Sequence, residues 1–216
     1  MSSDPAAITR RGVLLVLSAP SGAGKTSVAE GLLAADAGLR PSVSATTRSK
    51  RAGEVEGRHY RFLGEAEFAA MAESGALLEH ASVHGHRYGT PRAPVEAKLA
   101  AGRDLLLVID WQGARQLRAR LPSDVASVFL LPPSAADLEQ RLIGRGQDNA
   151  ATIAARMRDA SEFVARAVEY DYVVVNRELE RAIGDVAAIL RAERHRRARL
   201  SGLQPFLARL APGTGS

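Results

Sequence analysis

The sequence predicts an α/β fold with a mostly parallel, doubly wound sheet. Residues 13–17, 105–110, 125–131 and 172–175 form short, continuous apolar runs, which are typical of strands buried on both faces. Segments of helical character lie between these runs, and this alternation favours strands that run parallel. With 216 residues, 46% of them hydrophobic, the chain is long enough to bury one such core. We therefore expect one α/β unit, with room for small insertions.

The first strand leads into a glycine-rich loop. After residues 1–11, which we expect to be flexible, the apolar run 13–17 continues as Ser-Ala-Pro-Ser-Gly-Ala-Gly-Lys-Thr, and a helix is predicted over 27–35. The loop resembles G-x-x-x-x-G-K-[ST], which holds nucleotide phosphates at a helix N-terminus, although Ala19 replaces the first glycine. An ordinary glycine turn before a helix is the alternative. The succession of buried strand, loop and helix favours a phosphate-binding loop.

The two residues that end this loop carry its chemistry. Lys25 is placed to reach the β- and γ-phosphates of a nucleotide, and the hydroxyl of Thr26 is suited to coordinate the Mg²⁺ that accompanies them. Gly22 and Gly24 let the backbone approach the phosphates closely. The loop therefore predicts a nucleotide with its Mg²⁺ as a ligand.

The character of the chain changes between residues 41 and 100. Residues 41–63 are polar, β-leaning and rich in Ser, Thr and Arg, which is a poor composition for a core. A short helix over 65–73, a strand-like segment over 77–88 and a helix opened by Pro91 follow. We expect residues 41–100 to form a small lobe whose polar stretch is a functional surface.

The α/β alternation resumes with the run 105–110, which ends in Asp110. Ser134 to Asp137 resembles a capping box at the start of a helix that stops at Gly144. Residues 202–216 are expected to form a loosely held tail. The remaining expected elements are helices over 112–120, 151–168 and 178 to about 200, and strands over 125–131 and 172–175.

Charge indicates an anionic partner. The formal net charge is +5, and the positive residues are almost all arginines, because the only lysines are Lys25, Lys50 and Lys98. The planar guanidinium suits phosphate recognition, so composition is compatible with a phosphorylated small molecule or with nucleic acid. The arginines from Arg191 to Arg199 are better explained as a solvated helix face than as a nucleic-acid surface. We expect no nucleic-acid partner.

Targeting signals are not evident in the sequence. No apolar run approaches the roughly 18 residues of a membrane span, and residues 1–11 lack the apolar stretch of a signal peptide. The chain has no cysteine, which excludes disulfides and thiolate metal sites. We expect a cytoplasmic protein without membrane contact.

Several motifs, in order, resemble those of the guanylate kinase family over about residues 12–195. They are Ser18-Ala-Pro-Ser-Gly-Ala-Gly-Lys25, Ser42-Val-Ser-Ala-Thr-Thr-Arg48, Arg51-Ala-Gly-Glu54 with Gly57 and Tyr60, Glu79-His80, Tyr88-Gly89, Ile109-Asp-Trp-Gln-Gly113, and Arg141 with Gly144-Arg-Gly146. The resemblance implies transfer of the γ-phosphoryl group of ATP to GMP, and also to dGMP, with Mg²⁺ as cofactor. Oligomeric state stays open.

The resemblance also implies a P-loop NTPase core with two insertions. The family domain would cover 12–201, with a core of residues 12–40, 101–134 and 156–201. The GMP-binding lobe would cover 41–100 and a short lid 135–155. The residues that would hold ATP are Ala19, Pro20, Ser21, Gly22, Ala23, Gly24, Lys25, Thr26 and Ser27 of the loop, and Asn176.

The GMP phosphate would be held by two arginines and two tyrosines. Arg48 and Arg51, with the hydroxyls of Tyr60 and Tyr88, match the family positions for this role. An arginine fork binds two phosphate oxygens at once, which fixes direction as well as charge. Arg48 would also be catalytic. Taken singly, the arginines could be solvated surface residues and the tyrosines ordinary core or edge aromatics.

Guanine would be read by a carboxylate. Guanine presents two donors on one edge, N1–H and the N2 amino group, for which an ionised carboxylate is the natural bidentate acceptor. Glu79 stands where the family places that carboxylate, and Ser44 and Thr90 would serve guanine O6. Adenine has no donor at N1, so AMP would leave the buried carboxylate without partners. Outside this context Glu79 would be a surface charge.

Lid arginines and two further polar residues complete the expected site. Arg141, Arg145 and Arg156 match arginines that close over the phosphates and, with Lys25, would be catalytic. Asp110 is the candidate second group near Mg²⁺, together with Thr26, and its alternative role is that of a helix N-cap. Asn176 would contact adenine or would be a turn residue.

Two other functions stay open from the residues alone. One is a family member that has lost catalysis and binds phosphorylated protein segments. The other is a phosphate-loop kinase that acts on a phosphorylated ribose. The intact Gly24-Lys25-Thr26 and the lid arginines favour an enzyme, and Glu79 favours a guanine over a sugar acceptor.

Overall fold

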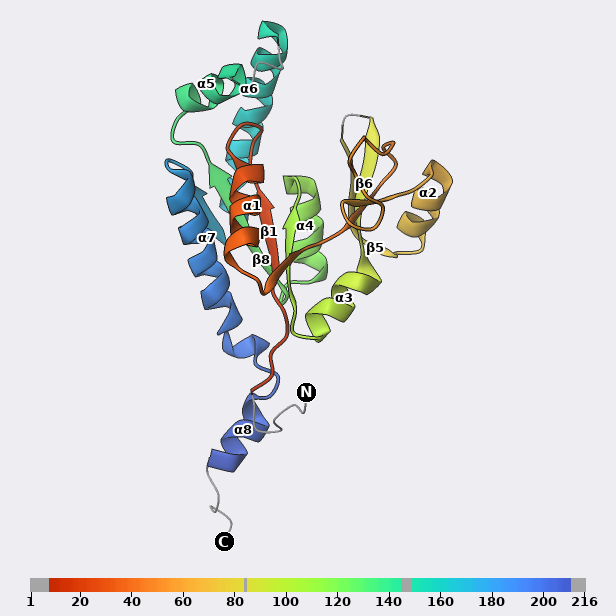
Figure 1. The fold of residues 1–216 in the computed structure, drawn as a ribbon, viewed down its shortest axis with the longest axis vertical. Coiled ribbons are helices and arrows are strands. Elements are labelled where there is room, and N and C mark those ends of the chain that lie inside the picture. Colours follow the sequence, from red (N-terminus) through yellow and green to blue (C-terminus); the bar gives the residue numbers. More distant parts are fainter. Residues whose placement is uncertain (1–7, 84, 145–148, 211–216) are drawn as a thin grey trace.

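The core is a five-stranded parallel sheet (Figure 1). The computed structural model describes residues 8–83, 85–144 and 149–210. The strands run in the order β2-β7-β1-β8-β9, and every neighbouring pair is parallel. The doubly wound α/β prediction is confirmed. The strands are β1 (Leu14–Ser18), β2 (Leu39–Pro41), β7 (Asp104–Val108), β8 (Val125–Leu131) and β9 (Tyr172–Val175).

Helices cover both faces of this sheet because its central strands are apolar on both sides. Helices α1 (Lys25–Ala35) and α7 (Leu179–Arg194) pack on one face. Helices α3 (Arg92–Ala100) and α4 (Trp111–Arg120) pack on the other. All five residues of β1 are fully buried, so the strand that leads into the glycine loop is held from both sides. This burial gives the loop a rigid base.

A second sheet forms a lobe beside the core (Figure 1). Its order is β4-β3-β6-β5, and the fully buried Phe68 of α2 (Glu65–Glu73) lies in its core with Leu77. The prediction of one strand over 77–88 is wrong, because the chain reverses there and Gly85 has a φ of 79°. The strands are β3 (Ser44–Thr46), β4 (Tyr60–Phe62), β5 (Leu77–Val83) and β6 (His86–Pro91).

The boundary between lobe and core differs from the expected one. Helix α3, which the sequence places in the lobe, packs through Val95 and Leu99 on the core sheet. The lobe sheet therefore ends at Pro91, and α3 is a core helix that carries the lobe. Pro41 likewise pairs with β7 in the core sheet.

Two helices stand above the carboxyl ends of the strands. Helices α5 (Ala135–Gly144) and α6 (Ala150–Ala165) pack together through Leu138, Leu142 and Ala160. The hydroxyl of Ser134 accepts a hydrogen bond from the backbone N–H of Asp137 at 3.0 Å and also bonds the Asp137 carboxylate, which is the predicted capping of α5. Helix α6 is continuous past residue 155 and ends in the short 3-10 turn η1 (Arg166–Glu169).

The helix predicted over 178 to about 200 is shorter in the structure. Helix α7 ends at Arg194, and the turn η2 (Arg197–Arg199) follows. The chain folds back there because Arg199, 3% exposed, pairs with buried Glu193 at 2.8 Å and donates to the carbonyl of Asp124 at 3.0 Å. Residues Leu203–Leu210 then form α8, a helix that the sequence does not predict, which projects from the body (Figure 1).

Part of the segment expected to be flexible is anchored. Arg10 donates two hydrogen bonds to the buried Asp104, at 2.7 and 2.8 Å, and Arg11 pairs with Asp124. Asp104 also accepts from Arg194 of α7, so one carboxylate links the chain start, the sheet and the last long helix. In the part of the chain that the structure describes, no helix has the length and apolar character needed to cross a membrane.

Candidate active site

The glycine loop lies between β1 and α1 at the carboxyl end of the sheet. Gly22 and Gly24 both have a φ of 91°, a left-handed backbone that side chains disfavour. Gly24 is the N-cap of α1, so the loop turns its backbone directly into the helix. Unpaired N–H groups and the positive end of the helix dipole therefore meet at this loop, which is the arrangement that binds anions.

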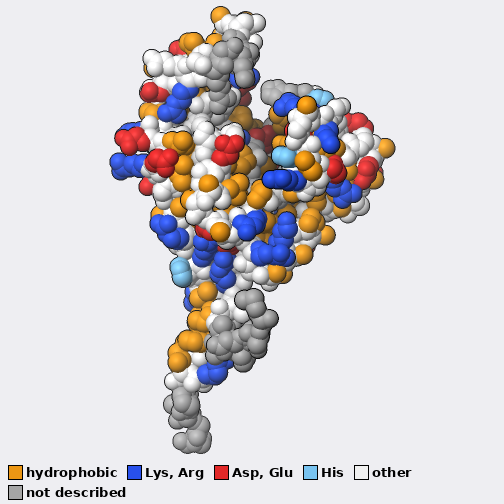
Figure 2. Space-filling view, viewed as in Figure 1, with side chains coloured by type: hydrophobic (Ala, Val, Ile, Leu, Met, Phe, Trp, Pro, Cys, Tyr) orange, Lys and Arg blue, Asp and Glu red, His pale blue; other side chains and the backbone are white. Residues whose placement is uncertain are grey.

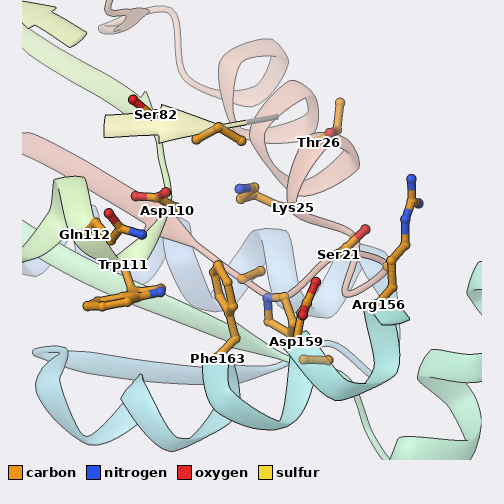
Figure 3. Close-up of a pocket in the computed structure, with 16 residues that line it drawn as sticks. Ser21, Lys25, Thr26, Ser82, Asp110, Trp111, Gln112, Arg156, Asp159 and Phe163 are labelled. Carbon is orange, nitrogen blue, oxygen red and sulfur yellow. The ribbon is translucent and has the colours of Figure 1, made fainter. Parts of the chain in front are cut away.

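A cavity of about 510 Å³ opens above the loop (Figure 3). The loop lines one side, and β5, α4 and α6 line the others; Figure 2 shows the surface hollowed between the helices α5 and α6 and the lobe. Ala23 and Ser27 do not line it; Ala23 is buried, and Ser27 is exposed on the first turn of α1. The other predicted loop residues line it: Ala19, Pro20, Ser21, Gly22, Gly24, Lys25 and Thr26.

Lys25 and Asp110 face each other across this cavity (Figure 3). Desolvation lowers the pKa of Lys25, and the charge of Asp110 opposes that shift. Asp110 is also the N-cap of α4, since its Oδ1 accepts from the Gly113 N–H at 3.0 Å. Its N-cap role is therefore real, and it does not remove the carboxylate from the cavity.

The donors fit a Mg²⁺ that arrives with phosphates. Thr26 and Asp110 line the same cavity and offer one hydroxyl and one carboxylate. Within the described residues, no group of three or more His, Asp or Glu could hold a metal ion by itself. Mg²⁺ in phosphate sites takes one or two protein ligands and fills the rest with water and phosphate oxygens. Thr26 and Asp110 match that donor set.

A second cavity of about 200 Å³ adjoins the first. It lies between the lobe and the core and brings together residues far apart in the chain. Lys25 and Asp110 line both cavities, so the two spaces meet at this pair. The polar residues of the second cavity are Lys25, Ser44, Tyr60, Glu79, Tyr88 and Asp110.

Glu79 is a buried acid on the lobe side of this second cavity. Its side chain lies on β5 and is 3% exposed, and its Oε1 accepts from the Thr90 hydroxyl at 2.6 Å. Burial, and secondarily the charge of Asp110, raises the pKa of Glu79 to about 7, although the hydrogen bond from Thr90 and the charge of Arg120 oppose this. Thr90 therefore orients Glu79 and does not line the cavity itself.

Gly113 lies beside the other carboxylate oxygen of Glu79. A Cβ atom at Gly113 would lie 2.5 Å from Glu79 Oε2, so a side chain at this position would displace the carboxylate. The backbone N–H of Gly113 also donates a hydrogen bond to Asp110 Oδ1. Gly113 therefore lies between the carboxylates of Glu79 and Asp110. The motif Ile109 to Gly113 includes this glycine, but the sequence alone does not indicate this role.

Arg48 is held by Glu54, an acid for which no role was predicted. Its guanidinium donates to Glu54 Oε1 at 2.7 Å and to Oε2 at 3.1 Å, and lies 5.4 Å from the ring centre of Tyr60. Glu54 also accepts from the backbone N–H of Arg51 at 2.7 Å. These contacts, the Arg48 hydrogen bond first, lower the pKa of Glu54 to about 2.

The predicted phosphate clamp is only partly assembled. Tyr60 and Tyr88 stand edge to face, with ring centres 6.0 Å apart, and both line the second cavity. Arg48, 9% exposed, adjoins Tyr60. Arg51 is exposed and does not line that cavity.

The lid arginines lie in three different situations. Arg156 of α6 lines the larger cavity, as Figure 3 shows. Arg141 of α5 does not line it, and its Nη2 donates to the backbone carbonyl of Asn176 at 3.0 Å. Arg145 lies outside the described residues.

Asn176 lies beneath the loop, where the expected contact with adenine has no support. Its side chain is 4% exposed and lines neither cavity, and its Nδ2 donates to the carbonyl of Ala23 at 2.8 Å. The turn-residue alternative describes its backbone, which follows β9.

Seven residues of the larger cavity were missed from the sequence: Ser82 and Val83 of β5, Trp111 and Gln112 of α4, and Asp159, Ala160 and Phe163 of α6. Trp111 and Gln112 belong to the first turn of α4, directly after Asp110, so their place beside a candidate acid was a usable signal. Asp159 and Phe163 lie on α6, one turn apart, and point toward the loop (Figure 3). Nothing in their local sequence distinguishes them from other residues of a surface helix.

Comparisons with known proteins agree with this geometry. The family model described as guanylate kinase matches residues 11–193. A guanylate kinase of Rhodospirillum rubrum is 54% identical over 209 residues, 97% of this chain and 96% of that protein. A guanylate kinase of Rhodopseudomonas palustris is 54% identical over 200 residues, which cover 93% of this chain and 91% of that protein.

A solved structure matches the fold as well as the sequence. The crystal structure of guanylate kinase from Anaplasma phagocytophilum has a TM-score of 0.76 and 37% identity, and the match covers 94% of this chain and 96% of that one. The family model alone covers most of the chain, and the relatives cover nearly all of it. The chain belongs to the guanylate kinase family.

Proposed function

We propose that this enzyme transfers the γ-phosphoryl group of ATP to GMP, giving ADP and GDP. The observation that carries this proposal is the junction of two cavities at Lys25 and Asp110. One cavity is floored by a phosphate-binding loop and the other is lined by a buried carboxylate, so a donor and a guanine acceptor would meet at a cation. dGMP, which presents the same base and phosphate, is expected to be a second acceptor.

The acceptor needs positioning more than it needs a base. The second pKa of a phosphate monoester is about 6, so the attacking oxygen of GMP is largely ionised at pH 7. The obstacle is the approach of two polyanions and the charge of a loose transition state. Arg48, Arg51, Tyr60 and Tyr88 would hold the GMP phosphate, the first of them from a position already fixed by Glu54.

Donor phosphates would lie on the loop. The loop N–H groups and Lys25 would hold the β- and γ-phosphates, and Arg156 of α6 would lie over them. Arg141 would have to leave the carbonyl of Asn176 to reach these phosphates. Arg145 is proposed to bind the phosphates as well. Arginines that arrive with closure stabilise the transferred group and exclude water.

Thr26 and Asp110 would hold Mg²⁺. When bound, Mg²⁺ supplies positive charge that screens the phosphate oxygens of the donor. Asp110 stays oriented for this by its hydrogen bond with Gly113. Because ATP and GMP are intracellular nucleotides, we also propose that the enzyme works in the cytoplasm.

Glu79 would select guanine. Ionised, it accepts from guanine N1–H and the N2 amino group, and Ser44 would bond O6. AMP offers no such donors, and leaving a buried carboxylate unpaired costs on the order of several kcal/mol. A phosphorylated ribose would leave Glu79 equally without a partner, which is the reason to prefer a guanine acceptor.

The proposal is tested by measuring ADP release from Mg·ATP with GMP, dGMP, AMP, CMP, UMP and ribose 1,5-bisphosphate as acceptors. We expect turnover with GMP and dGMP only. Turnover with the ribose bisphosphate would assign a sugar-phosphate kinase. The absence of turnover with every acceptor, in a protein that still binds GMP, would assign a binding module.

A further inference from the structure

Asn176 occupies the junction of the core sheet, the lid and the phosphate loop. Its backbone N–H donates to the carbonyl of Leu131, the last residue of β8, at 2.8 Å. Its own carbonyl accepts from Nη2 of Arg141 at 3.0 Å. The backbone of Asn176 is therefore fixed on the core sheet, and a lid arginine docks on it.

The side chain of Asn176 is fitted against the phosphate loop. Its Nδ2 donates to the carbonyl of Ala23 at 2.8 Å, and both residues are buried. A Cβ atom at Gly24 would collide with the same Nδ2, so the amide fills the space that the left-handed glycine leaves. The Ala23 carbonyl belongs to the peptide unit whose N–H is that of Gly24. Its orientation therefore sets the direction of one of the N–H groups of the loop.

We propose that Asn176 is a positioning residue for the phosphate loop. The hydrogen bond from Nδ2 to the Ala23 carbonyl holds that peptide in the orientation that turns its N–H toward the bound phosphates. Without the amide, the Ala23 carbonyl is a buried acceptor with no donor, and the peptide is free to rotate. The base of the nucleotide has no part in this role. The inference rests on the proposed function only in taking a triphosphate as the ligand of the loop.

Asn176→Ala separates this role from a contact with adenine. Binding of Mg·ATP, Mg·CTP and Mg·tripolyphosphate to wild type and variant is measured by isothermal titration calorimetry. We expect all three dissociation constants to rise by the same factor, about tenfold, the effect of one hydrogen bond. A loss confined to ATP would assign an adenine contact and overturn the proposal. Unchanged binding of tripolyphosphate would overturn it too.

Two further variants guard against a failure to fold. Asn176→Asp keeps the shape of the side chain but has no donor for the Ala23 carbonyl, so tripolyphosphate should bind at least as weakly as to Asn176→Ala. Asn176→Ser keeps a donor, although a shorter one, and should bind more tightly than either. The reverse order would contradict the proposal.

Ser127→Ala is the matched structural control. Ser127 is fully buried in β8, and its hydroxyl donates to Asp171 at 2.6 Å, away from the loop. Its loss should lower the melting temperature and leave tripolyphosphate binding unchanged. Equal weakening in Ser127→Ala would mean that general destabilisation explains Asn176, and the proposal would fail. If wild type does not phosphorylate GMP, the proposed function fails while this comparison stands.

Discussion

Replacing Glu79 by Gln should stabilise the free protein and abolish selection of guanine. The carboxyl of Glu79 is 3% exposed and accepts a hydrogen bond from Thr90. Burial first, and the charge of Asp110 second, raises its pKa to about 7. An ordinary glutamate has a pKa of about 4.5. The difference means that ionised Glu79 lowers the free energy of unfolding by about 3 kcal/mol.

The sign of this effect depends on pH. Between about pH 4.5 and 7 the folded chain keeps a proton at Glu79 that the unfolded chain releases, so the free energy of unfolding falls as pH rises. The loss is nearly complete above pH 7. Gln carries no charge, has nearly the same shape and can accept the hydrogen bond from Thr90. Glu79→Gln should therefore gain about 3 kcal/mol at pH 8 and under about 1 kcal/mol at pH 5.

Thermal unfolding followed by circular dichroism measures the gain. For a chain of this size, 1 kcal/mol moves the melting temperature by about 2 to 4 °C, so we expect a rise of roughly 6 to 12 °C at pH 8. The same variant should lose GMP turnover by at least about a hundredfold and bind Mg·ATP unchanged, because Gln offers a donor where guanine also has one. A melting shift that is equal at pH 5 and pH 8 would refute the reasoning.

Asp104→Asn is the control with the opposite sign. Burial favours the neutral acid at Asp104, but hydrogen bonds from Arg10, Val13 and Arg194 together outweigh it and lower the pKa of this carboxyl. Removing the charge leaves Arg10 without its acid and Arg194 with Asp36 alone, and the loss of one partner destabilises by about 3 to 5 kcal/mol in comparable buried pairs. The variant should melt at a lower temperature at pH 8.

Three further predictions concern the acceptor cavity. GMP binding, measured by calorimetry, should weaken about fivefold between pH 7 and pH 6, because only ionised Glu79 accepts two guanine donors, while Mg·ATP binding should change little. Gly113→Ala, whose Cβ would lie 2.5 Å from Glu79 Oε2, should raise the KM for GMP at least tenfold and leave that for ATP; equal increases would mean general damage. Glu54→Gln should raise the KM for GMP about tenfold by releasing Arg48, whereas Glu67→Gln, which breaks an exposed ion pair, should not; a lower KM in Glu54→Gln would mean that Glu54 competes with the phosphate.

The sequence predicted most of the fold because local patterns dictate it. Strands buried on both faces must be apolar throughout, so β1 and β8 are visible as runs of one character. The boundaries failed where a distant contact decides them. Helix α7 stops at Arg194 because Arg199 turns back to Glu193, although the arginine-rich sequence continues in a helical pattern. The reversal at Gly85 lies in a stretch that otherwise resembles one strand.

By itself the sequence determined which residue types the site contains, because the phosphate loop and the motifs around Arg48, Glu79 and Asp110 are each short, contiguous stretches of sequence. Tertiary structure alone decided what state those residues are in. Whether Glu79 is an exposed anion or a buried acid depends on the elements that pack around it, and whether Asn176 meets a base or the loop depends on where β9 ends. Desolvation and hydrogen-bond partners are properties of the folded surroundings, and residues distant in sequence supply them.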